Sequence, residues 1–390
     1  METYDLIVVG VGSMGSATCY ALAGRGLKVL GIERHRLGHE FGSHLGQSRL
    51  IRKAYFEHAD YVPLLQRAYE LWDEVEAQTG CQLFYRTGLL YHGRPDHDLI
   101  SGSLYSAATY RIEMQEINPA EVHKAYPQFT LPPDYVSYLE PDAGFLRPEL
   151  AIQMMGAFAQ SHGVDLHFDE WMTDYVRSGQ GWAVHTNRAV YSCEKLIITS
   201  GAWTSRLLPQ LTLHLRVTRQ ILGWLHKKSG PGVSLQQFPC WILADDTLGG
   251  AFYGFPELPP DPFGIPSGLK IAHHHPGMEI LPEDKDQSIQ AHELEALEYG
   301  LRVYLGEVKG SWSSFQHCMY TMSPDEHFVL DQLPGHPGVW IAAGFSGHGF
   351  KFAPVIGEIM ADLATSASSA LPISFLSLKR FQKPENPFHR

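Results

Sequence analysis

Short apolar segments near both ends and in the middle of this chain predict strands of a buried parallel sheet. Their centres are apolar without polar alternation, as expected for strands covered on both faces. They are residues 5–9 (DLIVV), 28–32 (KVLGI), 195–199 (KLIIT) and 339–343 (VWIAA). Weaker strand patterns occur at residues 165–168, 182–185 and 189–191.

Apolar positions at helical spacing predict helices between these strands. One follows residue 15 and ends near Gly24 and Gly26, and others cover residues 58–80, 149–162 and 354–363. Arg147-Pro148 opens the helix at 149–162 and Gly163 closes it.

The composition changes from about residue 216 to residue 324, where prolines and aromatic residues crowd together and the pattern alternates as in antiparallel strands. The predicted fold class is therefore α/β, or α+β for the whole chain. We expect a Rossmann-like dinucleotide-binding domain of residues 1–83, 141–215 and 325–390. A mostly antiparallel β-sheet domain of residues 84–140 and 216–324 would be interleaved with it and would bind the substrate.

Composition excludes several classes of protein. With 44% hydrophobic and 18% charged residues, the chain can bury a substantial core and is not a disordered or fibrous protein. Its formal net charge of −12 disfavours a nucleic-acid partner. No apolar run approaches the roughly 18 residues of a membrane-spanning helix. The five cysteines are scattered and lack a CxxC pair, which favours a reducing compartment. We expect no signal peptide or peroxisomal address, and hence a cytoplasmic location.

The first predicted strand leads into GVGSMG, with Gly10, Gly12 and Gly15 in G-x-G-x-x-G spacing. Gly10 permits the tight turn, Gly12 lets the backbone approach a pyrophosphate, and Gly15 lets the helix pack closely on the strand. The second strand ends at Glu33, where a carboxylate accepts hydrogen bonds from a ribose 2′-hydroxyl and repels a 2′-phosphate. The motif predicts a bound dinucleotide, disfavours NADP, and leaves NAD and FAD open.

A second glycine-rich segment, GFSGHGFKF, contains Gly344, Gly347 and Gly349 between a buried strand and a helix. The backbone there can approach a flat ligand closely, and the helix dipole suits a reduced flavin. An ordinary strand–helix turn is the alternative, and the polar side chains of His348 and Lys351 make it a weaker interpretation.

Three adjacent histidines in SGLKIAHHH suggest a metal site, but strand alternation argues against it. His273 and His275 point to one face, whereas His274 shares the other face with Lys270. No third ligand at suitable spacing is evident, so we predict a Lys270–His274 catalytic pair, with a solvated edge strand as the alternative.

Arg49, Arg52 and Lys53 form a basic cluster in an acidic chain, and arginine suits a carboxylate ligand. A solvated charged face is the alternative. Cys318 precedes a charge-rich segment, SPDEHFVLD; an isolated cysteine is more often a small core residue.

Taken together, the chain resembles the FAD-dependent amine oxidases that include monomeric sarcosine oxidase, N-methyltryptophan oxidase and pipecolate oxidase, within the D-amino-acid-oxidase-like superfamily. The matching motifs, in order, are GVGSMG, GSHLGQSRLIRKAY, YGFP, GLKIAHH, CMYTMSPDEHF and GFSGHGFKF. One departure is Leu45, where the family commonly has histidine, and it bears on the rate of covalent flavin attachment.

The resemblance implies a role for each matching residue. Cys318 would carry the FAD through a thioether, Lys270 would activate dioxygen, and Arg49 would lie over the other flavin face. Arg52 and Lys351 would clamp a substrate carboxylate, while Tyr253, His274 and His348 would line the pocket. The expected cofactor-binding residues are Gly10, Gly12, Ser13, Met14, Gly15, Glu33, Arg34, Ser43, His44, Arg49, Cys318, Gly344, Gly347, His348, Gly349 and Lys351.

The resemblance also implies the reaction: a monomeric oxidase of small N-methyl (secondary) amino acids such as sarcosine, passing hydride to FAD and reducing O2 to hydrogen peroxide. N-methyl-L-tryptophan or L-pipecolate oxidation is the alternative within the family. An NAD-dependent dehydrogenase and a non-catalytic binding module are the alternatives from other classes. No metal is expected.

Overall fold

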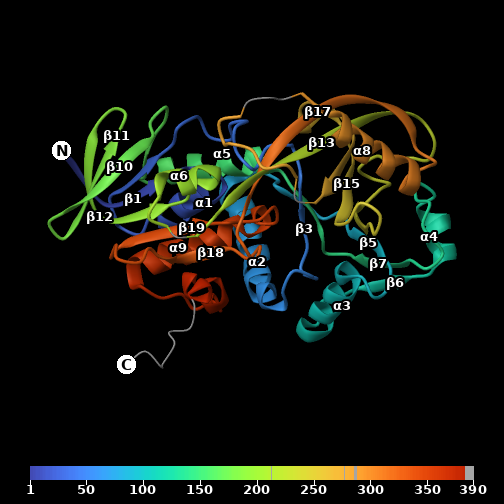
Figure 1. The fold of residues 1–390 in the computed structure, drawn as a ribbon, viewed down its shortest axis with the longest axis horizontal. Coiled ribbons are helices and arrows are strands. Elements are labelled where there is room, and N and C mark those ends of the chain that lie inside the picture. The colour runs from blue at the N-terminus through green and yellow to red at the C-terminus, as the bar shows by residue number, and fades with distance from the viewer. Residues whose placement is uncertain (212, 276, 285–287, 383–390) are drawn as a thin grey trace. The chain divides into compact units, whose positions relative to one another are not determined.

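The computed structural model describes residues 1–211, 213–275, 277–284 and 288–382. Its contacts divide the chain into two compact units made of non-adjacent segments. Unit 1 comprises Met1–Ser43, Ile152–Val217 and Tyr320–Arg390, and unit 2 comprises His44–Ala151 and Thr218–Met319. Figure 1 labels many elements of both.

A mixed sheet forms the centre of unit 1. Its parallel strands are β1 (Glu2–Val9), β2 (Val29–Ile32), β9 (Asp165–His167), β12 (Val190–Ile198) and β19 (Val339–Ala343). Its antiparallel strands are β10 (Met172–Ser178), β11 (Gly181–Thr186) and β18 (Val329–Gln332). The last five residues of β1 and all of β2 and β19 are buried apart from Asp5, as their apolar sequences predict.

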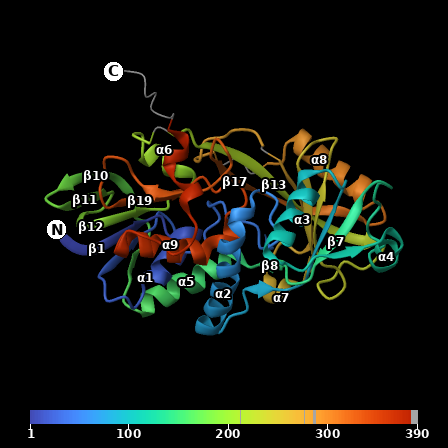
Figure 2. The ribbon, with the colours of Figure 1, turned by 90° about the horizontal axis from the view of Figure 1, so that it is seen from below.

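Two helices of unit 1, α1 (Ser13–Leu22) and α9 (Ala353–Ser366), lie side by side (Figure 2). A Cβ atom on Gly357 would lie 2.4 Å from backbone atoms of Ala17. Glycine at this position therefore permits the close contact between the helices. The helix α5 (Pro148–Ser161) begins in unit 2 and continues into unit 1.

The predicted strands and helices of unit 1 are confirmed, with one correction. We expected two strands at residues 189–191 and 195–199, whereas β12 is continuous from Val190 to Ile198. Its first half pairs with β11 and alternates between buried and less buried residues, and its second half pairs with β19 and is buried throughout. The change of neighbour explains why one strand gives two sequence patterns.

An eight-stranded sheet forms most of unit 2. In spatial order its strands are β17 (Lys309–Met322), β13 (Arg216–Ser229), β16 (Gly268–His274), β15 (Ala251–Leu258), β14 (Cys240–Ala244), β5 (Leu89–Gly93), β7 (Val136–Glu140) and β6 (Gln115–Ile117). The core on one face includes Phe252, Leu269 and Ile271 together with Leu297 and Tyr304 of α8 (Ala291–Tyr304). The pairs β13–β16, β14–β15 and β15–β16 are all antiparallel. They confirm the antiparallel strands predicted between residues 216 and 324.

Unit 2 also contains a small sheet of β3 (Arg49–Ile51), β8 (Gly144–Leu146) and β4 (Phe84–Tyr85). Its helices include α2 (Val62–Thr79), α3 (Asp98–Tyr110), α4 (Pro119–Ala125) and the short α7 (Pro260–Phe263). The helix expected at residues 58–80 begins as a 3₁₀ turn at Ala59–Tyr61, and Gly80 ends α2 in the left-handed conformation.

The compact units differ from the expected domains in residues 44–83 and 141–151, which belong to unit 2, and in residues 216–217 and 320–324, which belong to unit 1. Pairing of β3 and β4 with β8 explains the first of these differences. Buried Glu140 is a second reason, because its carboxylate accepts hydrogen bonds from the N–H groups of Lys53 and Ala54, at 2.7 and 3.3 Å. The assignment of cofactor and substrate to particular segments stays a prediction.

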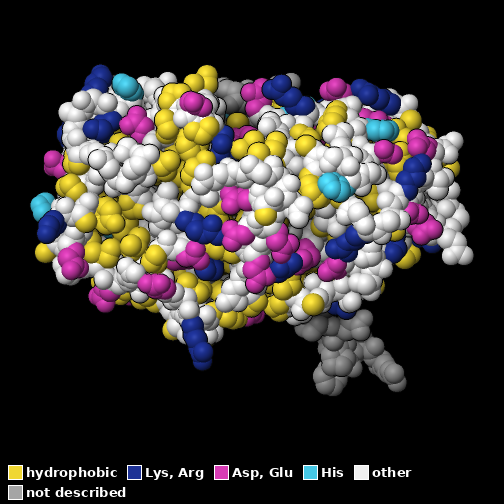
Figure 3. Space-filling model, turned by 180° about the vertical axis from the view of Figure 1, so that it is seen from behind, with side chains coloured by type: hydrophobic (Ala, Val, Ile, Leu, Met, Phe, Trp, Pro, Cys, Tyr) yellow, Lys and Arg dark blue, Asp and Glu magenta, His cyan; other side chains and the backbone are white. Residues whose placement is uncertain are grey.

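Basic and acidic side chains are interspersed on the face shown in Figure 3, and no continuous basic area occurs in that view. Among the described residues, no helix combines the length and apolar character that crossing a membrane requires.

Candidate functional site

The glycine-rich turn after β1 has the geometry that its sequence predicts. Gly10 has φ +87°, and a Cβ atom there would lie 2.8 Å from the carbonyl oxygen of Thr199. A Cβ on Gly15 would lie 1.8 Å from the carbonyl oxygen of Gly10. Backbone-to-backbone contact therefore requires glycine at both positions.

Gly12 differs from these two glycines, because a Cβ atom there would have no neighbour within 4 Å. It precedes α1, whose first turn contains Ser13 and Met14, and as the N-cap residue it has no side chain with which to cap that helix. An open backbone at an uncapped helix N-terminus fits a dinucleotide pyrophosphate.

Glu33 is held at the end of β2 as a buried carboxylate. Its oxygens accept the N–H groups of Val11 and His35, at 2.8 and 2.9 Å, and Nε2 of His39 lies 3.5 Å away. Burial alone would raise the pKa of Glu33, but His39 and the two N–H groups hold it below its ordinary value. An ionised acceptor at this place fits a ribose hydroxyl.

Three further predicted cofactor residues are Arg34, Ser43 and His44. Arg34 stacks over the Trp171 ring, 5.2 Å from its centroid. Ser43 is exposed at the end of the first segment of unit 1, and His44 is buried at the start of unit 2.

The loop after β19 is tightly packed within unit 1. Gly344 and Gly347 have φ +64° and +80°, and a Cβ on Gly347 would lie 2.4 Å from the Tyr320 ring. A Cβ on Gly349 would lie 2.6 Å from Phe345. This packing explains the glycines and leaves little room for another side chain.

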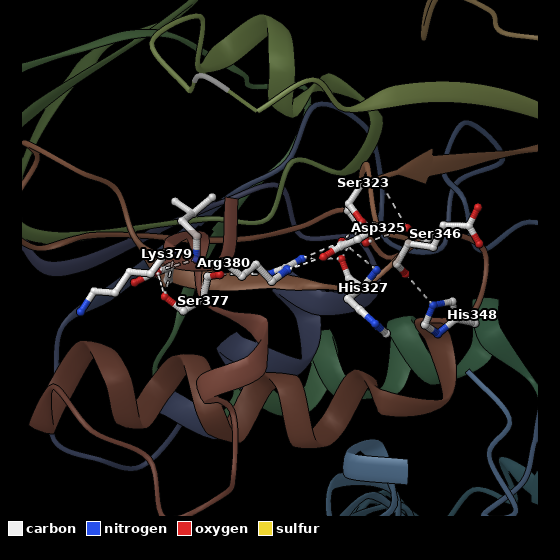
Figure 4. A network of polar contacts seen from close by, with 12 residues as sticks. Ser323, Asp325, His327, Ser346, His348, Ser377, Lys379 and Arg380 are labelled. Atoms are coloured by element: carbon white, nitrogen blue, oxygen red, sulfur yellow. Dashed lines mark hydrogen bonds and ion pairs between the residues drawn. The ribbon is translucent and has the colours of Figure 1, made fainter. Parts of the chain in front are cut away.

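His348 and Lys351 are buried in this loop and its following 3₁₀ turn. His348 Nε2 lies 3.0 Å from the carbonyl oxygen of Glu326, and its ring stacks on Phe328. Lys351 Nζ donates to the carbonyl oxygen of His348 at 2.7 Å. Figure 4 shows His348 and Ser346 beside the turn that begins at Ser323.

In unit 2, strand register places Lys270, Tyr253 and His274 on one face of the large sheet. Phe255 pairs with Lys270, Tyr253 with Ala272, and Ala251 with His274, and directly paired residues share a face. His273 is on the opposite face and stacks on Phe252 at 4.4 Å. The predicted common face of Lys270 and His274 is confirmed.

Lys270 is a buried ammonium held by neutral acceptors. Its Nζ donates to the carbonyl oxygens of Gly46 and Ser48, at 2.5 and 2.8 Å, and to Ser48 Oγ at 3.2 Å. It also lies over the rings of Trp224 and Phe255. Burial lowers the pKa of Lys270 well below its ordinary value, and Arg49 lowers it further, whereas Glu149 opposes the shift.

The three cations that are adjacent in sequence have separate partners. Arg49 donates to the carbonyl oxygens of Leu45 and Ser48. The buried Arg52 pairs with both carboxylate oxygens of Glu57 at 2.8 Å, and Lys53 pairs with Asp142. Arg52 and Lys53 therefore each face a carboxylate of their own.

Cys318 is a free thiol, only 2% exposed, on β17. Within the described ranges, no group of three or more His, Cys, Asp or Glu residues is placed to hold a metal ion.

Sequence reasoning missed four acids and bases that position these residues: His39, Glu57, Glu140 and Glu149. Glu149 Oε1 accepts the N–H groups of Gly46 and Gln47, at 2.8 and 3.0 Å. Its place in the first turn of α5 was a usable signal, since acids there commonly bind N–H groups. The residues that His39, Glu57 and Glu140 contact are set by the fold and had no such signal in the sequence.

The family model described as "FAD dependent oxidoreductase" (DAO) matches residues 5–363. The chain belongs to this family. It is 38% identical over 380 residues to monomeric sarcosine oxidase of Streptomyces avermitilis, which covers 97% of this chain and 98% of that protein. It is 35% identical over 383 residues to N-methyl-L-tryptophan oxidase of Yersinia pestis, covering 97% of this chain and 100% of that protein.

Solved structures agree with this membership. NikD, an amino acid oxidase of nikkomycin biosynthesis, matches with a TM-score of 0.84 and 26% identity, covering 97% of this chain and 98% of NikD. L-proline dehydrogenase from P. horikoshii matches with a TM-score of 0.83 at 21% identity, covering 97% and 98%, and shares the fold. The expected fold class and family are confirmed: the chain is an FAD-dependent oxidoreductase of the amino acid oxidase type, and the NAD-dependent alternative is wrong.

Proposed function

We propose that this protein is a flavin-dependent oxidase of small secondary amino acids, with sarcosine-like N-methyl amino acids as its substrates. The observation that carries the proposal is the full-length similarity to monomeric sarcosine oxidase. Bulkier N-methyl-L-tryptophan is the second candidate, because N-methyl-L-tryptophan oxidase of Yersinia pestis is nearly as similar to this chain.

The FAD fits the residues of unit 1. Gly12 and the uncapped start of α1 leave space and N–H donors for its pyrophosphate, and Glu33 offers an ionised acceptor for its ribose. We assign Ser13, Met14, Arg34 and Ser43 to the same binding region. Cys318 would carry the flavin through a thioether, and His44 and Arg49 would contact it.

When bound, the flavin supplies the hydride acceptor and, through dioxygen, the route to hydrogen peroxide. The protein's part is electrostatic. Lys351 and Arg52 would hold the substrate carboxylate, and Tyr253, His274 and His348 would shape the pocket around the amine.

Lys270 would stabilise negative charge on dioxygen, and its environment supports this role. Its hydrogen bonds go to two carbonyl groups and a hydroxyl group rather than to a carboxylate. A buried ammonium with neutral partners keeps its electrostatic effect on a nearby anion.

The proposal also includes that the protein is a monomer and that it is located in the cytoplasm.

The test is a peroxide assay with sarcosine, N-methyl-L-tryptophan, L-pipecolate and L-proline, accompanied by anaerobic bleaching of the flavin. We expect sarcosine to bleach the flavin and yield peroxide with the highest kcat/KM. Bleaching by N-methyl-L-tryptophan alone would favour the second candidate. Failure of all four amines to bleach a yellow protein would refute the amine oxidase assignment.

A further inference from the structure

The C-terminal part of unit 1 is joined to the turn between β17 and β18 by charged contacts (Figure 4). Arg380, in the 3₁₀ turn Leu378–Phe381, places Nε 2.7 Å from Asp325 Oδ2 and Nη2 3.1 Å from Asp325 Oδ1. The same Nη2 donates to the carbonyl oxygen of His327 at 3.0 Å. This arrangement is bidentate, so it fixes the orientation of the turn as well as its position.

A second contact anchors the C-terminal segment itself. Ser377 Oγ and the N–H of Leu378 both donate to Asp331 Oδ2, at 2.6 and 2.8 Å. Arg380 therefore extends from a fixed backbone and contacts the turn as a rigid support.

The turn that Arg380 holds is strained. Glu326 has φ +62°, in the left-handed region that non-glycine residues avoid. Asp325 Oδ1 accepts the N–H of His327 at 3.2 Å, and Ser323 Oγ donates to the carbonyl oxygen of His327 at 2.7 Å. Such a conformation persists only where the surroundings hold it, and Arg380 binds two of these residues directly.

On its other side the turn contacts the glycine-rich loop. Ser323 N–H donates to Ser346 Oγ at 3.1 Å, and the carbonyl oxygen of Glu326 lies 3.0 Å from His348 Nε2. A carbonyl oxygen only accepts hydrogen bonds, so this contact places a proton on Nε2 of His348. The carbonyl of His348 in turn accepts Lys351 Nζ.

We propose that Arg380 is a positioning residue for His348 and Lys351. By holding the 323–327 turn, it keeps the Glu326 carbonyl where it fixes the ring orientation and tautomer of His348. This inference rests on the proposed function, which places His348 and Lys351 against the substrate. It assigns the C-terminal segment a part in substrate binding through contacts with residues 53 and 55 positions away in the sequence of the same unit.

The first test compares Arg380→Met with Arg25→Met in the full-length holoenzyme. Arg25 forms an ion pair with Asp362 at 2.9 Å, also in unit 1, and it is remote in sequence from the turn. We expect Arg380→Met to lower kcat/KM for the amine substrate about tenfold, mainly through KM. Arg25→Met should leave both constants unchanged. Equal effects of the two substitutions would overturn the proposal.

The second test uses the strained residue. Adding Glu326→Gly to Arg380→Met should recover most of the lost kcat/KM, because glycine adopts φ +62° without strain and keeps the carbonyl oxygen. An ion pair that merely stabilised the fold would show no such rescue. Absence of rescue, with both variants folded, would therefore contradict the positioning role.

The third readout does not need activity. Nitrogen-15 NMR of labelled histidine, with His348 assigned by a His348→Asn variant, should show the Nε2-protonated form in the wild type. Arg380→Met should shift it toward a mixture of tautomers, and so should Asp325→Asn, the variant to use if Arg380→Met does not fold. An unchanged His348 signal would refute the proposal, whereas a wild-type enzyme that no amine reduces would refute only the proposed function.

Discussion

Replacement by alanine should have different effects at two glycines of the same turn: at Gly15 it should lower stability, and at Gly12 it should weaken FAD binding. A Cβ on Gly15 would overlap the carbonyl oxygen of Gly10 at 1.8 Å, and it would also lie 2.8 Å from Thr199 Oγ1. Because the main obstacle is backbone, the helix or the turn must move. We expect Gly15→Ala to lower the free energy of unfolding by about 3 kcal/mol, at the upper end for overpacked sites.

Gly12→Ala should leave the protein itself almost unchanged. The added Cβ has no neighbour within 4 Å, and φ is −74°. Alanine caps a helix less well than glycine, which lowers the free energy of unfolding, and it reduces the entropy of the unfolded chain, which raises that free energy. Each effect is about 0.5–1 kcal/mol, so the two nearly cancel. The same methyl group would occupy the space assigned to the pyrophosphate. Losing one charge-assisted hydrogen bond of about 1.5–3 kcal/mol corresponds to FAD binding that is weaker by roughly 10- to 150-fold.

The assay uses a Cys318→Ser background, so that FAD binds reversibly and the protein can be studied with and without it. Chemical denaturation of the flavin-free protein measures stability, and flavin fluorescence measures the dissociation constant. We expect Gly15→Ala to be destabilised without FAD and Gly12→Ala to differ only in FAD binding. If Gly12→Ala kept full FAD affinity, or destabilised the flavin-free protein as much as Gly15→Ala does, the assigned pyrophosphate site would be wrong.

Three further predictions concern unit 2. Lys270→Met should slow reoxidation of the reduced flavin by oxygen about 100-fold and flavin reduction by substrate far less; equal slowing in stopped-flow measurements would refute the oxygen-activating role. Acid precipitation should leave wild-type protein yellow and release the flavin from Cys318→Ser, so flavin released from both would exclude the thioether. Glu149→Gln removes a charge that opposes the lowered pKa of Lys270, so the pH above which reoxidation slows should move downward; an upward shift would contradict the electrostatic link.

The strands and glycines that build the dinucleotide fold could be predicted because their signals are local. Apolar runs mark β1 and β19, and a Cβ atom on Gly15 would meet the carbonyl oxygen of Gly10 within the same turn. The common face of Lys270 and His274 also followed from a local rule, the alternation of side chains along a strand. The same rule separated His274 from His273 and so argued against a metal site.

Partners from distant segments could not be predicted. Glu140 lies 87 positions from Lys53, whose N–H it accepts, and Glu149 lies 103 positions from Gly46. Nothing near either acid in the sequence indicates which N–H groups it meets. For the same reason the compact unit that contains residues 44–83 differs from the expected domain bounds, because β8 pairs both with β3 and with β4, which come from distant parts of the chain.

The partners of the cations also decide which of them can attract an anionic substrate. Arg52 is already neutralised by Glu57, and its Nη1 donates to the carbonyl oxygen of Ala54. Burial opposes its charge, yet Glu57 raises the pKa of Arg52 above its ordinary value. Breaking that pair would leave a buried carboxylate unpaired, at a cost of about 3–5 kcal/mol. A substrate carboxylate that binds Arg52 should therefore meet its remaining N–H groups with Glu57 still bound.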